Sequence, residues 1–334
     1  GPSPLDDQLL YAGTDDGLLH VTEDGGSNWR KIEAEKLPGV PKRAFINDIK
    51  ADLHDANTVY VALDNHKEGD YAPYLFKSTN RGESWTNIGT SLPHGHWVWR
   101  LVQDHVDPEL LFAGTEGGVY FSQNGGKEWT KLKGGMPTIG VRDLVIQQRE
   151  NDLVAGTFGR GIYILDDYSA LRDFSISEAP DTSVIYPPRK AWNYSPRSVS
   201  HSQGDNTYSA SNPEFGATFT YYLNETIKTR KEQRKEREKE LESDEDHPFP
   251  DWEALDRELD ELQPRVEIEI RDTDGQLLSR VKAKRKKGLH RTSWNLRASM
   301  PMLIEKDNPD RQRSYRVADG NYQAQLVKFV DGIY

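Results

Sequence analysis

The sequence predicts a mainly β protein, with an incomplete β-propeller in its first half and a small β-sandwich in its second half. Three observations predict this fold. An octet of the form Ser/Thr-x-Asp/Asn-x-Gly-x-x-Trp starts at residues 22, 78 and 122. Each octet follows a Gly-rich hairpin between apolar runs, and the spacing of the octets fits one four-stranded propeller blade. After residue 168 the composition changes, and alternating apolar runs return only beyond a charged stretch.

Each unit of the first half combines a leading strand, an Asx/Pro turn, two strands around a Gly-rich turn, the octet and a last strand. The Gly-rich hairpins are LLYAGTDDGLLHV, VYVALDNHKEGDYAPYLFK and LLFAGTEGGVYF, and a fourth, LVAGTFGRGIYILDD, lacks the octet. These units predict about three and a half blades over residues 5–168. A ring needs more blades, so a missing N-terminal half of the propeller is an expected partner. Residues 1–4, GPSP, are interpreted as a protease-cleavage remnant outside the fold.

The octets TEDGGSNW, STNRGESW and SQNGGKEW are predicted to staple one hairpin in each blade. Their Asx side chain can accept backbone N–H bonds across the turn, and their glycine gives the backbone freedom for a tight reversal. Their indole can pack between neighbouring blades. A cation or ligand site is the alternative, which the neutral Asn in two octets disfavours. The residues concerned are Thr22, Asp24, Gly26, Trp29, Ser78, Asn80, Gly82, Trp85, Ser122, Asn124, Gly126 and Trp129.

These octets, in register with the hairpins, resemble the Asp-box (BNR) repeats of sialidases, xyloglucan-degrading propeller hydrolases and sortilin-type receptors. The resemblance implies that each octet joins the third and fourth strands of a blade. Over the whole chain the sequence is similar to large bacterial proteins labelled sortilin-like or glycosyl-hydrolase-like. This implies an extracytoplasmic location, whether periplasmic, associated with the outer membrane or secreted. It fixes no reaction.

The second half begins with a segment rich in Pro, Ser and Asn over residues 169–213, which predicts an extended linker anchored by Trp192 and Tyr194. Strand-like runs follow, and a DTDG turn between two of them predicts a hairpin. We expect a β-sandwich over residues 214–334. The motifs at Asp272–Gly275, Gly288–Trp294 and Gly320–Tyr322 resemble the Ig-like module of the flagellar hook-capping protein.

A helical insertion is predicted over residues 224–264, after the first strand of this sandwich. Its first part is a Lys/Glu-laced helix without an apolar stripe. Its second part is a short helix in which four apolar residues recur at helical spacing, and we expect this stripe to face the core. The stripe consists of Trp252, Leu255, Leu259 and Leu262.

Composition excludes several function classes. The net charge of −11 disfavours nucleic acid as a partner, because phosphate binding needs a basic face. The absence of cysteine removes disulfides, Cys-ligated zinc and thiol nucleophiles. No apolar run is long enough to span a membrane. The sequence also lacks a P-loop, GxSxG and HExxH, so no cofactor is predicted.

Candidate site residues come from the leading strands, which begin at one end of a propeller channel. Asp48 and Asp143 occupy equivalent blade positions and are weak candidates for the carboxylate pair of a glycosidase. Arg100, Arg142 and Arg160 come one per blade and could grip an acidic ligand, as the arginines of a sialidase do. The alternative for all five residues is that they bond neighbouring blades to one another.

The stretch HGHWVWR is the most site-like local sequence. His94 and His96 could chelate a metal, and Trp97 and Trp99 could stack on a sugar or peptide, whereas local packing is the third interpretation. No third metal ligand can be named, so no metal is predicted. We therefore expect a non-catalytic binding or scaffold protein that recognises envelope or secreted proteins, peptides or surface glycans. A sialidase- or xyloglucanase-like glycoside hydrolase completed by missing blades is the first alternative, and a purely structural half-propeller is the second.

Overall fold

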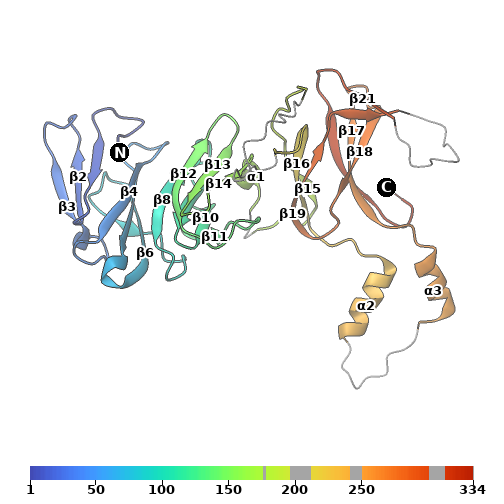
Figure 1. Cartoon of the computed structure of the whole chain (residues 1–334), viewed down its shortest axis with the longest axis horizontal. Coiled ribbons are helices and arrows are strands. Elements are labelled where there is room, and N and C mark those ends of the chain that lie inside the picture. The colour runs from blue at the N-terminus through green and yellow to red at the C-terminus, as the bar shows by residue number, and fades with distance from the viewer. Residues whose placement is uncertain (176–177, 196–211, 241–249, 301–312, 334) are drawn as a thin grey trace, which may run out of the picture. The chain divides into compact units, whose positions relative to one another are not determined.

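The computed structural model describes residues 1–175, 178–195, 212–240, 250–300 and 313–333. The chain is mainly β, as predicted, and divides into two compact units, Gly1–Ser175 and Ile176–Tyr334 (Figure 1). Within the described residues, no helix is long and apolar enough to cross a membrane.

Unit 1 contains four antiparallel sheets in which consecutive strands are neighbours. We call these sheets blades 1 to 4. Blade 1 consists of β1 (Leu10–Gly13), β2 (Leu18–Thr22) and β3 (Arg30–Glu33); blade 2 of β4 (Phe45–Ala51), β5 (Val59–Asn65), β6 (Asp70–Ser78) and β7 (Thr86–Asn87); blade 3 of β8 (Val98–Gln103), β9 (Leu111–Thr115), β10 (Gly118–Ser122) and β11 (Thr130–Lys131); blade 4 of β12 (Val141–Gln147), β13 (Asp152–Thr157) and β14 (Ile162–Leu165). Short 3-10 turns, η1 (Ala34–Lys36) and η2 (His66–Glu68), and the one-turn helix α1 (Ala170–Asp173) complete the unit.

The blades stack face to face, and an apolar cluster fills each junction. Leu19 of blade 1 packs in one cluster with Phe76 of blade 2. Tyr60 of blade 2 shares the next cluster with Leu101 of blade 3, and the third cluster joins blades 3 and 4. The strands β4, β8 and β12 lie beside one another as the leading strands of their blades. This order and stacking are those of a partial β-propeller, so the predicted fold class is confirmed.

Residues 1–4, interpreted from sequence as a cleavage remnant, lie against blade 1. Pro2 forms a bridge with Leu10, and the backbone N–H of Tyr11 donates to the carbonyl of Gly1 at 3.0 Å. The segment therefore occupies the position that a leading strand would take beside β1.

The three octets form the same turn. Thr22, Ser78 and Ser122 each donate their hydroxyl to the Asx Oδ1 two residues on, at 2.8–2.9 Å. Each hydroxyl also accepts the N–H of the glycine four residues on, at 2.8–2.9 Å. The Asx Oδ1 accepts a further backbone N–H at 2.8–2.9 Å. The glycines take φ of +84° to +98°, which other residues rarely adopt. In blades 2 and 3 the octet joins the third strand to the fourth.

The described residues of unit 2 form two three-stranded sheets and a two-stranded ribbon. One sheet has the order β15 (Val184–Ile185), β16 (Ala217–Leu223), β19 (Gly288–Trp294); the other has the order β18 (Leu277–Ala283), β17 (Arg265–Arg271), β22 (Gln323–Phe329); the ribbon pairs β20 (Arg297–Ser299) with β21 (Ser314–Arg316). The sheets share one apolar cluster that includes Phe219, Ile268 and Trp294, so they form a β-sandwich. The predicted linker contains α1 and β15, and its residues 196–211 lie outside the described part of the chain.

The helices α2 (Arg230–Glu240) and α3 (Trp252–Leu259) lie between β16 and β17 in the chain. The expectation that the apolar stripe of the second helix faces the core is wrong. Trp252, Leu259 and Leu262 are 77%, 81% and 60% exposed. The helices meet instead through an ion pair, in which Arg234 Nε lies 2.7 Å from Glu258 Oε1. The helical spacing shows that these apolar residues share one face of the helix, but it does not show which part of the protein would pack against that face.

Candidate functional site

A β-bulge shapes the same point of three leading strands. The pairing register shifts between Ile46 and Asp48, between Val98 and Arg100, and between Val141 and Asp143. One residue is left over in each strand, and a bulge of this kind re-aims the side chains on either side of it. The leftover residues are Asn47, Trp99 and Arg142. Three blades therefore present one row of bulge residues and one row of residues that follow them.

The row after the bulge is an ion bridge across blades 2, 3 and 4. Arg100 Nη1 lies 3.1 Å from Asp48 Oδ1, and its Nε lies 3.1 Å from Asp143 Oδ1. Asp48 Oδ2 also accepts the backbone N–H of Leu101 at 3.0 Å. The Asp48 side chain is 6% exposed, whereas that of Asp143 is 62% exposed. The two aspartates proposed from sequence are thus brought together, but a guanidinium stands between them.

Two of the three bulge residues, Trp99 and Arg142, belong to an aromatic cluster. The Arg142 guanidinium carbon lies 3.6 Å from the centre of the Trp99 ring and 5.0 Å from that of Phe158. Glu116 joins these groups, since its Oε2 accepts the Trp99 indole N–H at 2.8 Å and lies 3.5 Å from Arg142 Nη2. The third bulge residue, Asn47, donates its amide to the carbonyl of Val98 at 2.8 Å and so links blades 2 and 3.

The cluster extends to blade 2 through Trp97. Its ring lies 6.0 Å from that of Trp99 and is stacked on His66, with centroids 5.2 Å apart and planes at 3°. Tyr71 adds a third ring 5.6 Å from Trp97. His66 in turn hydrogen-bonds the buried carboxylate of Asp64 through Nδ1. We call Tyr71, Trp97, Trp99, Arg142 and Phe158 the rim cluster.

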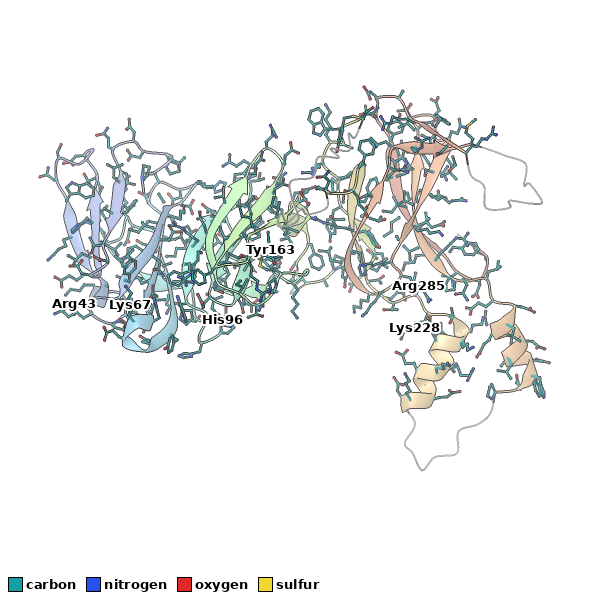
Figure 2. The ribbon with its side chains drawn as sticks, in the orientation of Figure 1. Arg43, Lys67, His96, Tyr163, Lys228 and Arg285 are labelled. Carbon is teal, nitrogen blue, oxygen red and sulfur yellow. The ribbon has the colours of Figure 1, made fainter. Side chains whose placement is uncertain are left out.

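The rim cluster has both buried and exposed members. Phe158 is 68% exposed and Tyr71 is 43% exposed, whereas the Trp97 indole nitrogen is buried without a hydrogen-bond partner among the described residues. Arg43, Lys67 and His96 mark the edge of unit 1 at which the leading strands begin (Figure 2). The cluster thus offers apolar rings and a cation at one end of the blades.

The two histidines of HGHWVWR do not form a joint site. His96 Nδ1 lies 2.8 Å from the Tyr120 hydroxyl, and burial, with a smaller effect of Lys131, lowers the pKa of His96. Its ring also lies over Gly117, where any Cβ would come within 2.0 Å of the imidazole. His94 is exposed. Within the residues that the structure describes, no group of three His, Cys, Asp or Glu side chains could hold a metal ion.

Of the other sequence candidates, Trp97, Trp99 and Arg142 lie in the rim cluster, and Arg160 lies exposed on the β13–β14 turn. No motif in the sequence points to His66, Tyr71 or Glu116 as site residues. They lie around the Gly-rich turns of blades 2 and 3, and only the stacking of the blades brings them to the tryptophans.

The chain matches no protein-family model and no curated protein. Among solved structures it is similar to an ancestral GH74 enzyme, with a TM-score of 0.40 and 18% identity over 67% of this chain and 30% of that chain. YCF48 bound to D1 peptide gives a TM-score of 0.38 and 18% identity over 50% of both chains. The extracellular domain of the putative one component system BT4673 from B. thetaiotaomicron gives 0.37 and 17% over 48% of this chain and 20% of that chain. The chain thus spans half or less of the length of each.

Proposed function

We propose that this chain is a non-catalytic binding or scaffold protein that recognises a protein, peptide or glycan through the rim cluster. The observation that carries the proposal is the arrangement of Trp97, Trp99, Arg142 and Phe158, which come from two blades and meet Tyr71 of a third. Aromatic residues and arginine supply most of the energy at protein interfaces. Exposed apolar surface of this kind marks interaction sites.

The ion bridge argues against the hydrolase alternative for the residues of this chain. A glycosidase needs open space between its two carboxyl groups for the sugar and the bond that is cleaved. The Arg100 guanidinium lies between Asp48 and Asp143 instead, 3.1 Å from a carboxylate oxygen of each. The ion bridge supports the interpretation that Asp48, Arg100 and Asp143 bond neighbouring blades to one another.

The test is a screen of the protein against glycan and peptide arrays, followed by affinity measurements on each hit. Phe158→Ala and Tyr71→Ala remove the two most exposed rings of the rim cluster. Each substitution should weaken binding about ten-fold or more, as the loss of an interface anchor does. Trp29→Ala is the matched control, because Trp29 is a 47% exposed aromatic residue outside the rim cluster. Hits that both rim variants bind as tightly as the unmodified protein would contradict the proposal, as would the absence of any hit.

The second candidate function, a half-propeller that pairs with further blades, is favoured by the outer face of blade 4. Val145, Val154 and Ile164 lie opposite one another across its three strands, and Val145 and Ile164 are 54% and 58% exposed. The same row in blade 3 consists of Val102, Phe112 and Phe121 and packs against blade 4. A sheet face of this composition is normally covered.

Size-exclusion chromatography with light scattering tests this second candidate. We expect the chain to self-associate, or to bind a protein that carries further blades, and Ile164→Asp should abolish that association. A chain that stays monomeric alone and in the presence of such blades would contradict it.

The extracytoplasmic location implied by the resemblance of the octets is part of the same proposal. Fractionation of cells that produce the intact protein would test it.

A further inference from the structure

The helix α3 carries an apolar stripe that the described residues of unit 2 leave uncovered. Trp252 and Leu259 are 77% and 81% exposed, and Leu262, just beyond the end of the helix, is 60% exposed. With the half-buried Leu255, these residues recur at alternating spacings of three and four, which is the a/d pattern of a helix that packs against another helix. Exposed apolar surface with this regularity marks an interaction site.

Hydrogen bonds and an ion pair hold α3 beside α2 (Figure 1). Arg234 Nε and Nη2 lie 2.7 and 3.0 Å from the two carboxylate oxygens of Glu258. The backbone N–H of Arg230 donates to the carboxylate of Glu261 at 2.9 Å. The side chain of Asp251 accepts a backbone N–H in the first turn of α3 at 2.7 Å. An isolated helix of this length is marginal, so these bonds preform the stripe and lower the entropic cost of binding.

The sandwich supports the same pair of helices. Both Nη atoms of Arg285, from the turn between β18 and β19, lie 2.8 Å from carboxylate oxygens of Glu232 in the first turn of α2. Leu262 lies beside the turn after β22, because a Cβ at Gly332 would be 3.7 Å from Leu262 Cδ1. Ile333 of that turn is 73% exposed. The stripe is thus fixed to the sandwich and ends near a further exposed apolar residue.

A row of carboxylates borders the stripe on the side away from α2. Glu253, Asp256 and Asp260 recur at helical spacing, and all three are exposed. None of them forms an ion pair with a described residue, whereas Glu258 on the opposite side of the helix is paired with α2. The basic residue of α3, Arg257, donates to a backbone carbonyl of its own helix. An apolar seam with a negative edge is complementary to a helix with positive charges along its edge.

We propose that α3 docks a basic amphipathic helix of a partner protein. Apolar side chains of that helix would pack on Trp252 and Leu259, and its lysines or arginines would lie along Asp256 and Asp260. A second copy of α3 lacks this complement, since antiparallel packing through the stripe would place one carboxylate row against the other. The proposal is independent of the functions proposed for unit 1.

The test uses the full chain and a fluorescein-labelled peptide of a few heptads, with Leu at positions a and d and Lys at e and g. Fluorescence anisotropy should show saturable binding that weakens as the salt concentration rises. A peptide with the same leucines and Glu at e and g should bind about ten-fold more weakly or less. Failure of the Lys peptide to bind saturably would overturn the proposal, as would equal binding of the two peptides.

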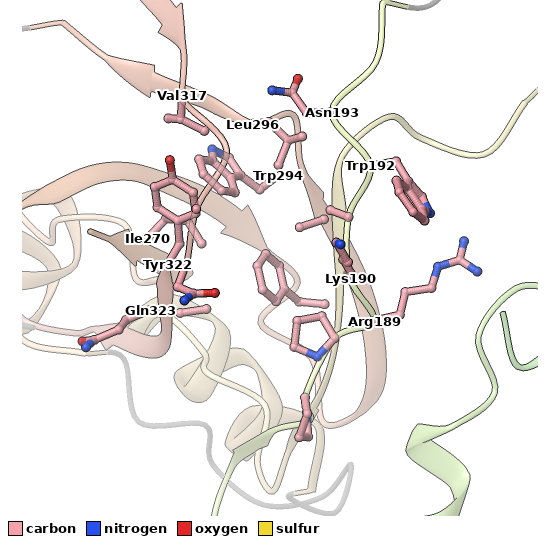
Figure 3. Close-up of a pocket in the computed structure, with 18 of the residues that line it drawn as sticks. Arg189, Lys190, Trp192, Asn193, Ile270, Trp294, Leu296, Val317, Tyr322 and Gln323 are labelled. Atoms are coloured by element: carbon pink, nitrogen blue, oxygen red, sulfur yellow. The ribbon is translucent and has the colours of Figure 1, made fainter. Parts of the chain in front are cut away.

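The apolar stripe is tested with Trp252→Ala/Leu259→Ala, which should weaken binding of the Lys peptide about ten-fold or more, as the loss of interface anchors does. Trp192→Ala/Leu5→Ala is the matched control, because it removes the same side-chain types where they are 61% and 50% exposed elsewhere. Figure 3 shows Trp192 on the segment 185–193 beside the sandwich. The control should bind as the unmodified chain does. Equal binding by a folded stripe variant would overturn the proposal.

The negative edge is tested separately with Asp256→Lys/Asp260→Lys. This variant should bind the Lys peptide about three-fold more weakly or less, and the Glu peptide more tightly. Asp15→Lys/Glu35→Lys makes the same change of net charge at exposed positions of unit 1, so it controls for general attraction to an acidic chain. Equal effects of the two variants on the Lys peptide would contradict a role for the edge in docking.

Light scattering distinguishes a partner helix from a second copy of this chain. The measurement is made on Ile164→Asp, so that the exposed face of blade 4 does not contribute to association. We expect this variant to be a monomer. A dimer that Trp252→Ala/Leu259→Ala dissociates would show that a second copy covers the stripe, and it would overturn the proposal.

Discussion

Trp129 and Trp29 occupy the same position of the same octet, yet their environments differ. Trp129 is 8% exposed, packs in the cluster between blades 2 and 3, and donates its indole N–H to the carbonyl of Ile88 at 2.7 Å. Trp29 is 47% exposed and donates only to Gly26 of its own turn. The two turns share the hydrogen bonds of the hydroxyl and of the Asx Oδ1. The octet therefore determines the hairpin, while the preceding blade determines whether the indole is buried.

The largest effect expected from this comparison concerns the indoles. Trp129→Ala should lower the free energy of unfolding of unit 1 by about 3–5 kcal/mol, because it opens a cavity in a packed junction. Trp29→Ala should cost about 0.5 kcal/mol or less, as surface substitutions do. Urea titrations followed by tyrosine fluorescence and circular dichroism measure both. Equal losses would show that the indole acts within its own turn rather than on the preceding blade.

Removal of the octet hydroxyls should lower the free energy of unfolding by a smaller amount. This loss should be similar in the first and third octets. Ser122→Ala and Thr22→Val each remove the acceptor of a glycine N–H and the donor to the Asx side chain. Both hydroxyl residues are 1% exposed, so each change should cost about 1–3 kcal/mol. The same urea titrations compare them. A loss confined to Ser122→Ala would mean that the first turn is not stapled like the third.

The smallest effect is a pH dependence found in the first octet but not in the others. The backbone N–H and side-chain amide of Asn28, with the Thr22 hydroxyl, lower the pKa of Asp24 from 3.8 to about 2. A lowered pKa stabilises the fold above pH 3.8, and this contribution is lost as the pH falls toward 2. Asp24→Asn should therefore flatten the fall of Tm over this range. Asn124→Asp, which places a carboxylate in the third octet, should steepen it; unchanged slopes would contradict the assignment.

The fold of unit 1 could be predicted from the sequence because each blade contains a copy of the same sequence repeat. Three octets and four Gly-rich hairpins recur at blade spacing, and each lies where the structure has a turn between strands. The prediction that the apolar stripe of α3 faces the core was wrong, because no repeat or neighbouring motif specifies what packs against this helix. Spacing on a helix shows which residues share a face, but the cover for Trp252 and Leu259 would have to come from elsewhere, and they are exposed.

The candidate site could be predicted only in part. Trp97, Trp99 and Arg142 were selected because they start leading strands, and they do meet. Their partners His66 and Glu116 come from other turns, and their approach depends on how the blades stack. The bulges that aim these side chains are register shifts between two strands, which no single stretch of sequence displays.

The most direct test of the central claim, that the leading-strand carboxylates hold blades together and perform no hydrolysis, is a paired measurement on Asp48→Asn. Thermal unfolding and hydrolysis of xyloglucan and sialosides are measured on the variant and on the unmodified protein. We predict a lower Tm for the variant, since the buried Asp48 loses its charge beside Arg100, and no hydrolysis by either protein. Hydrolysis by the unmodified protein that disappears in an equally stable variant would contradict the claim.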